Sequence, residues 1–81
     1  MEKTIIVKST AGLHASLASK VVQTASKYDV DVRLVYADKV VDAKSILGLM
    51  SLAIPFGTDV QLVAVGPDAE KAIKDIQKIL G

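Results

Sequence analysis

The sequence predicts an α+β fold in which a four-stranded antiparallel sheet is covered on one face by three helices. Its 81 residues suffice for one compact domain and not for two, so we expect residues 1–81 to form a single domain. Hydrophobic residues make up 51% of the chain, which is ample for one core. The apolar spacing changes along the chain in the order β-α-β-β-α-β-α, with short strands.

The first strand and the first helix follow from a change in apolar spacing. Residues 2–8 are predicted as a strand whose apolar part runs from Ile5 to Val7. After a loop over residues 9–12, the spacing becomes helical from Ala15, and we expect this helix to end near Lys27. Its predicted apolar positions are Ala18, Val21, Val22 and Ala25.

A hairpin and a short helix follow in the middle of the chain. Residues 31–36 alternate between faces, residues 37–39 supply a turn, and Val40 begins the return strand. Ser45 fits the N-cap of a short and very apolar helix within residues 43–54. Residues 55–58 then interrupt that helix.

The last strand and the last helix are separated by a break over residues 66–68. The strand shows alternation, with Val60, Leu62 and Ala64 on one face. Asp68 is predicted as the N-cap of the final helix. The apolar stripe of that helix consists of Ala72, Ile73, Ile76, Ile79 and Leu80.

These elements admit two topologies. Short strands and a tight hairpin favour an antiparallel sheet with the helices on one side, because the apolar face of the sheet must be covered. A ferredoxin-like arrangement is the main alternative, since it uses the same βαββαβ order.

Composition excludes several classes of function. A net charge of +1 gives no large electrostatic field, and only 4% of the residues are aromatic, so we expect no direct binding of nucleic acid. The chain has no cysteine and one histidine, which disfavours a metal site, and we expect no cofactor. No stretch is long enough to span a bilayer, so we expect a soluble, cytoplasmic protein without membrane insertion.

His14, the only histidine, stands just before the first predicted helix. The first N–H groups of a helix lack intrahelical partners and, with the helix dipole, they favour negative charge. Neutral imidazole is a nucleophile near pH 7, and Gly12 leaves room for a phosphate donor to approach. These residues indicate a transient phosphohistidine. The alternative is a solvated loop histidine or a partial helix cap, which needs no chemistry.

Ser45 and the short helix after it also have two interpretations each. As an N-cap, the Ser45 hydroxyl can accept a hydrogen bond from the N–H of Leu47 or Gly48. The apolar residues of the helix either all belong to the core, or Leu47 and Met50 lie together outside as a docking surface. Phe56, in the following loop, fits core and surface equally.

Two motifs together resemble a known family. The stretch "GLHA" at residues 12–15, with "KSILGLMSLAI" at residues 44–54, is similar to the histidine-containing phosphocarrier protein (HPr) family of the bacterial phosphotransferase system. That family includes catabolite-repression (Crh-like) paralogues. The likeness covers the whole chain in length and element order, and it implies an open-faced β-sandwich.

The resemblance also implies a function and partners. His14 would take a phosphoryl group on Nδ1 from enzyme I and pass it to the IIA domains of sugar permeases, as a carrier rather than a true enzyme. Ser45 would be phosphorylated by an ATP-dependent HPr kinase/phosphorylase. Enzyme I, the IIA domains and a LacI-type catabolite repressor would dock on a surface that includes Gly12, Leu47 and Met50.

The residues after the histidine depart from the family pattern. The family usually continues His-Ala-Arg-Pro-Ala, whereas this chain has Ser16 and Leu17 in place of the arginine and the proline. A guanidinium makes charge-assisted bonds to phosphate oxygens, while a serine hydroxyl offers one neutral hydrogen bond. The difference is on the order of 1–2 kcal/mol, or about tenfold in transfer.

This departure leaves alternatives open. Lys20, one turn after Ser16, either lends positive charge to the site or is a solvated helix residue. The alternative function is a mainly regulatory paralogue, which transfers phosphate weakly and acts as a corepressor when Ser45 is phosphorylated. A third interpretation, an unrelated ferredoxin-like interaction domain, leaves both motifs to chance.

Overall fold

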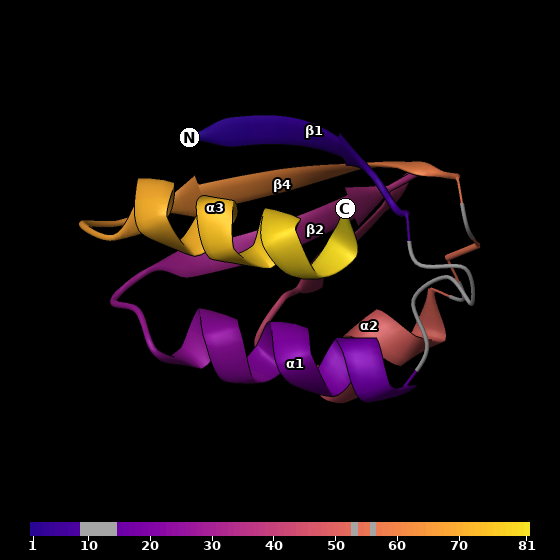
Figure 1. The fold of residues 1–81 in the computed structure, drawn as a ribbon, viewed down its shortest axis with the longest axis horizontal. Coiled ribbons are helices and arrows are strands. Elements are labelled where there is room, and N and C mark those ends of the chain that lie inside the picture. Colours follow the sequence, from indigo (N-terminus) through magenta and orange to yellow (C-terminus); the bar gives the residue numbers. More distant parts are fainter. Residues whose placement is uncertain (9–14, 53, 56) are drawn as a thin grey trace.

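The computed structural model describes residues 1–8, 15–52, 54–55 and 57–81, in which the elements follow the predicted order (Figure 1). Gly12, His14 and Phe56 lie outside the described residues, so the structure does not test the predictions made for them. The elements are β1 (Glu2–Ile6), α1 (Ala15–Ser26), β2 (Asp31–Tyr36), β3 (Lys39–Asp42), α2 (Ile46–Ser51), β4 (Asp59–Val65) and α3 (Ala69–Leu80).

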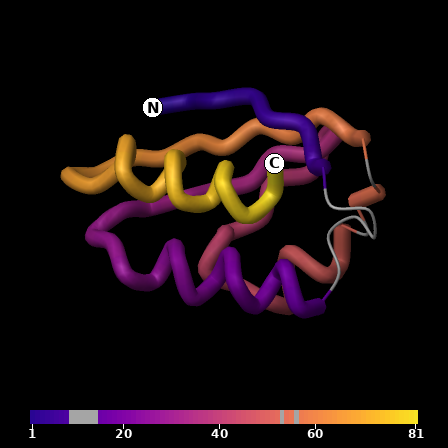
Figure 2. Tube along the Cα trace, in the orientation of Figure 1, coloured from indigo at the N-terminus to yellow at the C-terminus, as the bar shows by residue number. Residues whose placement is uncertain are grey.

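The sheet is antiparallel throughout, with the strand order β1-β4-β2-β3. This order places β4 and β2 in the centre, and Leu62 of β4 pairs with Lys3 on one side and with Leu34 on the other. All three helices lie on the same face of the sheet (Figures 1 and 2). The predicted open-faced arrangement is therefore confirmed, and the ferredoxin-like alternative, which has its first and third strands in the centre, is wrong.

The core forms where the apolar stripes of the strands and helices meet. Alternate residues of β2 and β4 point toward the helices, because side chains along a strand alternate between faces. Their inward residues are buried, and so are those of the helices, whose apolar stripes repeat every three or four positions. Residues that are fully buried include Val21, Val32, Leu34, Leu62, Ala64, Ile73 and Ile76.

The first strand is shorter than predicted, and alternation divides its apolar run. Ile5 and Val7 are buried, whereas Ile6 is 47% exposed on the opposite face. Val7 lies beyond β1, yet its N–H donates to the Thr58 carbonyl at 3.0 Å and its carbonyl accepts from Gly57 at 2.8 Å. These two hydrogen bonds join the residue after β1 to the segment that precedes β4.

Both long helices differ in detail from the prediction. Helix α1 ends at Ser26, its residue Leu17 joins the core, and Val22 is only half-buried. Asp68 occupies the N-cap position of α3, but its side chain makes no cap hydrogen bond. Its carboxylate instead accepts from the backbone N–H of Asp29 at 3.0 Å, so Asp68 stands at the predicted N-cap position without capping the helix through its side chain. This hydrogen bond joins the start of α3 to the loop before β2.

Gly66 allows the same two loops to approach closely. Its φ is +143°, and a Cβ built there would lie 2.9 Å from the Asp29 carbonyl oxygen. Any larger residue would push these loops apart, because such a contact lies inside van der Waals distance.

The short helix α2 depends on Ser45 for its start. The Ser45 backbone is extended, with φ −110° and ψ 109°, and its Oγ accepts from the N–H of Gly48 at 3.1 Å. This is one of the two predicted partners. The Ser45 carbonyl also accepts from the N–H of Leu49 at 3.0 Å, which begins the helical pattern. Because α2 has only six residues, the cap satisfies a large share of its unpaired donors.

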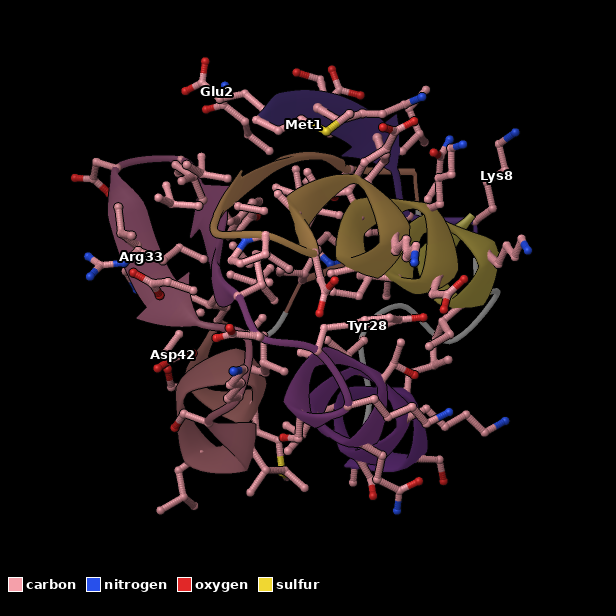
Figure 3. The ribbon with its side chains drawn as sticks, turned by 90° about the vertical axis from the view of Figure 1, so that its left-hand side faces the viewer. Met1, Glu2, Lys8, Tyr28, Arg33 and Asp42 are labelled. Atoms are coloured by element: carbon pink, nitrogen blue, oxygen red, sulfur yellow. The ribbon has the colours of Figure 1, made fainter. Side chains whose placement is uncertain are left out.

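A tyrosine after α1 joins this helix to α3. The Tyr28 hydroxyl donates to the Asp75 carboxylate, and Figure 3 shows Tyr28 between α1 and α3. That hydrogen bond raises the pKa of Tyr28 from its ordinary value of 10.0, with smaller contributions from burial and from the charges of Asp75 and Asp68. The carbonyl of Tyr28 also accepts from Lys44 Nζ at 3.4 Å, which extends the contact toward the start of α2.

Tyr28 should make stability depend on pH in alkaline solution. Because its pKa is higher in the folded chain, the hydroxyl contributes stability below about pH 10, and this contribution is lost as pH rises through the folded-state pKa. Urea unfolding between pH 8 and about pH 11 should therefore show a steeper loss of stability in the wild type than in Tyr28→Phe. Tyr36→Phe is the control, since it removes a hydroxyl without touching Asp75. Equal slopes in wild type and Tyr28→Phe would contradict this prediction.

Removal of the Ser45 cap should destabilise the fold. Ser45→Ala leaves the N–H of Gly48 without its side-chain acceptor, and we expect the free energy of unfolding to fall by about 1 kcal/mol in urea titrations. Ser51→Ala is a matched control at the other end of α2, where the Ser51 hydroxyl donates to the Gly48 carbonyl at 2.7 Å. As an exposed position, it should change stability by less than about 0.5 kcal/mol. If Ser45→Ala and Ser51→Ala lower the free energy of unfolding equally, the Ser45 cap does not contribute more than an ordinary surface hydroxyl.

Candidate functional site

The first turn of α1 follows His14 directly in the sequence. Helix α1 begins at Ala15, and its first N–H groups have no acceptor within the helix. Ser16 and Lys20 are both exposed and lie four residues apart, which places them on the same side of the helix. Lys20 therefore follows Ser16 by one turn on the same exposed side of α1.

Leu17 has a different environment from its neighbour Ser16. Its side chain is 9% exposed and belongs to the hydrophobic core, together with Ala18 and Val21 one turn later. The residue that replaces the family's proline therefore anchors the first turn by apolar contact. Leu17 thus adds apolar burial at a position where a proline ring would fix the backbone.

Ser45 lies in the short connection between β3 and α2. It is half-buried, and its Oγ is engaged with Gly48 of the helix. The preceding residue, Lys44, is exposed, and its backbone N–H donates to the Asp42 carboxylate at 2.9 Å. The connection is therefore held by side chains at both of its ends.

Helix α2 divides its apolar residues between the core and the surface. Leu49 is fully buried, and Leu52 just beyond the helix is 6% exposed. The remaining large side chains are exposed: Leu47 by 79%, Met50 by 46% and Ile46 by 40%. We refer to Ile46, Leu47 and Met50 as the α2 patch.

The α2 patch agrees with one of the two sequence interpretations. Leu47 and Met50 do lie outside, whereas the alternative that all residues of α2 belong to the core is wrong. The sequence reasoning missed Ile46, although its position four residues before Met50, on the same side of the helix, could have indicated it. Three adjoining apolar side chains on six helical residues form a larger patch than the isolated exposed residues that are common on protein surfaces.

The α2 patch and the start of α1 lie toward the same end of the molecule. The two helices contact each other, and Figures 1 and 2 show α2 alongside the N-terminal half of α1. The start of α1 and helix α2, which are far apart in the sequence, therefore lie side by side. A partner that covers one of these regions is able to reach the other.

The described residues contain no group of three His, Cys, Asp or Glu side chains that could hold a metal ion. None of the helices in the described part of the chain has the length and the hydrophobicity needed to cross a bilayer. The features of the candidate site that the structure describes are therefore the start of α1, the capped start of α2 and the α2 patch.

Comparison with known proteins places this chain among phosphocarriers. The family model described as "PTS HPr component phosphorylation site" matches residues 1–81. Phosphocarrier protein HPr of Haloferax volcanii is 45% identical over 82 residues, which cover 99% of this chain and 92% of that protein.

Solved structures show the same relationship. The phosphocarrier protein HPr of Bacillus anthracis str. Ames matches with a TM-score of 0.96 at 34% identity, over 100% of this chain and 96% of that one. Crh, a Bacillus subtilis catabolite repression protein described as a dimer with a swapped domain, matches with a TM-score of 0.79 at 41% identity, over 94% and 87% of the two chains. Because the family model spans every residue and the relatives share both sequence and fold, this chain belongs to the HPr family of phosphocarrier proteins of the phosphotransferase system.

Proposed function

We propose that the chain relays phosphoryl groups through His14 in the cytoplasm, from enzyme I to the IIA domains of sugar permeases. Proteins of the HPr family interact with enzymes of the phosphotransferase system, which supports these partners. The observation that carries the proposal is the start of α1 at Ala15, one residue after His14. A phosphoryl group on the imidazole has negative charge, and the helix dipole together with the N–H groups that lack an acceptor within the helix favours such charge at a helix start.

Ser45 is the proposed site of regulation by an ATP-dependent HPr kinase/phosphorylase. It directly precedes Ile46 of the α2 patch, so a phosphate there adds a charge of about −1.5 to −2 at the border of an apolar surface. The helix itself tolerates this charge, because a dianion is favourable at a helix start. We therefore expect phosphorylation to change which partners dock on the α2 patch without unfolding α2.

A second candidate function is mainly regulatory. Ser16 and Leu17 replace the arginine and proline that usually follow the family histidine, and Crh, a catabolite repression protein, shares 41% identity with this chain. In this version, the chain transfers phosphate weakly and binds a LacI-type catabolite repressor when Ser45 is phosphorylated. The two functions are compatible within one protein, and the rate of phosphorylation by enzyme I separates them.

Two phosphorylation reactions distinguish the two sites. With enzyme I and phosphoenolpyruvate, the chain should gain an acid-labile phosphoryl group, which is lost in His14→Ala and kept in Ser45→Ala. With ATP and the kinase, it should gain an acid-stable group with the opposite dependence on these variants. Radiolabelled phosphate, followed through acid treatment and gel electrophoresis, measures both. Absence of any acid-labile label in the wild type would exclude the carrier function.

The residue after Ala15 should control the transfer rate. Ser16→Arg restores a guanidinium beside the phosphoryl group, and we expect phosphorylation by enzyme I to accelerate by about tenfold. Rapid-quench measurements of the acid-labile adduct give the rate.

Lys20→Ala is the companion variant for the same measurement. A slower transfer would indicate that Lys20 supplies positive charge in the absence of the arginine, and an unchanged rate would identify it as a solvated helix residue. If Ser16→Arg has no effect on the rate, the missing guanidinium does not limit transfer.

The α2 patch should contribute to docking without contributing to folding. Because Leu47 is 79% exposed, Leu47→Ala should leave thermal stability nearly unchanged while it weakens binding to enzyme I by about tenfold. Isothermal titration calorimetry with enzyme I measures the affinity. Lys71→Ala, on the exposed side of α3, is the control for a surface change outside the patch. Equal affinities of Leu47→Ala and the wild type would remove the α2 patch from the proposed interface.

A further inference from the structure

We propose that Met50 is a site of reversible oxidation, at which a peroxide converts the thioether to a sulfoxide and weakens the docking of partners on the α2 patch. This proposal rests on the proposed function, because it assumes that partners dock there. It adds a chemical modification that would respond to oxidants, separate from phosphorylation at His14 or Ser45.

The position of Met50 makes its sulfur accessible. The side chain is 46% exposed, and it lies beside Leu47 and Ile46, which are also exposed. A buried methionine is protected from peroxide by its surroundings, whereas a half-exposed one on a short surface helix can be attacked by a dissolved oxidant. The chain contains no cysteine, which would otherwise be the preferred target of a peroxide.

The reaction balances with hydrogen peroxide as the oxidant. The sulfur lone pair attacks one peroxide oxygen, an S–O bond forms, and the O–O bond breaks. The sulfur is oxidised by two electrons, the peroxide is reduced, and water leaves. Methionine sulfoxide reductases reverse this reaction, so the modification is reversible.

The consequence for docking follows from the polarity of the product. A thioether is apolar and flexible, and it adapts to partners of different shapes. A sulfoxide carries a strong hydrogen-bond acceptor, which loses its water when the patch is covered by an apolar partner surface. We therefore expect oxidation of Met50 to weaken binding to enzyme I by about tenfold or more.

Oxidation should leave the fold intact. Leu49 and Leu52, which are buried, hold α2 against the rest of the molecule, and Ser45 caps its start. Met50 is not part of the buried core. A loss of binding after oxidation would thus arise at the surface rather than from unfolding.

Met1, the other methionine, provides an internal control. It is 54% exposed, so it should be oxidised as readily as Met50. Its amino group donates to the Ala64 carbonyl of β4, and Figure 3 shows Met1 at the β1 side of the molecule, opposite α2. Oxidation of Met1 should therefore have no effect on the α2 patch.

The experiment compares the wild type, which has both methionines, with Met50→Leu, in which Met1 is the sole methionine. Each protein is treated with hydrogen peroxide, the peroxide is removed, and peptide mass spectrometry locates the added oxygen. Calorimetry then measures binding to unoxidised enzyme I for treated and untreated samples of each protein, and circular dichroism measures their thermal unfolding. Incubation with methionine sulfoxide reductases follows as the test of reversal.

We expect the oxidised wild type to bind about tenfold or more weakly than the untreated wild type, to recover after the reductases, and to unfold at the same temperature. Treated Met50→Leu should bind like its own untreated form. The proposal is overturned if Met50 stays unmodified under conditions that oxidise Met1, or if the oxidised and untreated wild type bind equally. If the untreated wild type itself does not bind enzyme I, the proposed function fails, and the docking part of this proposal fails with it.

Discussion

The structure depends on the burial of one face of its sheet beneath three helices. β4 and β2 occupy the centre, and their inward side chains, such as Leu34 and Leu62, are fully buried. Since side chains along a strand alternate between faces, this burial orients the outward residues of the same strands away from the helices. The described residues proposed for function lie on α1 and α2 or directly before α2. The sheet thus acts as the support on which the starts of α1 and α2 are held.

Helix α2 shows how a very short element satisfies two opposed requirements. Six residues provide little intrinsic helical stability, so the helix needs both the Ser45 cap and the burial of Leu49. Only part of its circumference can face the core, and Leu47 and Met50 remain in solvent as a consequence. The same geometry that limits the stability of α2 therefore leaves an apolar surface exposed, on which we propose that partners dock. It also leaves a sulfur atom open to oxidants.

The first turn of α1 differs from the family pattern in two ways that have separate physical consequences. Leu17 packs into the core, so its replacement of proline affects how the turn is anchored. Ser16 is exposed, so its replacement of arginine concerns the charge available to a phosphoryl group. A change at the exposed position therefore leaves the core contacts of the fold in place, and we propose that it affects phosphoryl transfer instead.

Local sequence patterns determined the elements and the Ser45 cap, because strand alternation, helical spacing and capping act over a few residues, whereas they left open whether Leu47 and Met50 are buried or exposed. The contact of Asp68 with Asp29, the hydrogen bond between Tyr28 and Asp75, and the strand order β1-β4-β2-β3 join residues that are far apart in the chain. Only the tertiary structure decided these, since a side chain with several possible partners takes the one that packing brings to it. Similarly, the sequence indicated His14 as a candidate nucleophile, while the contact between α1 and α2 emerged from the packing of the two helices.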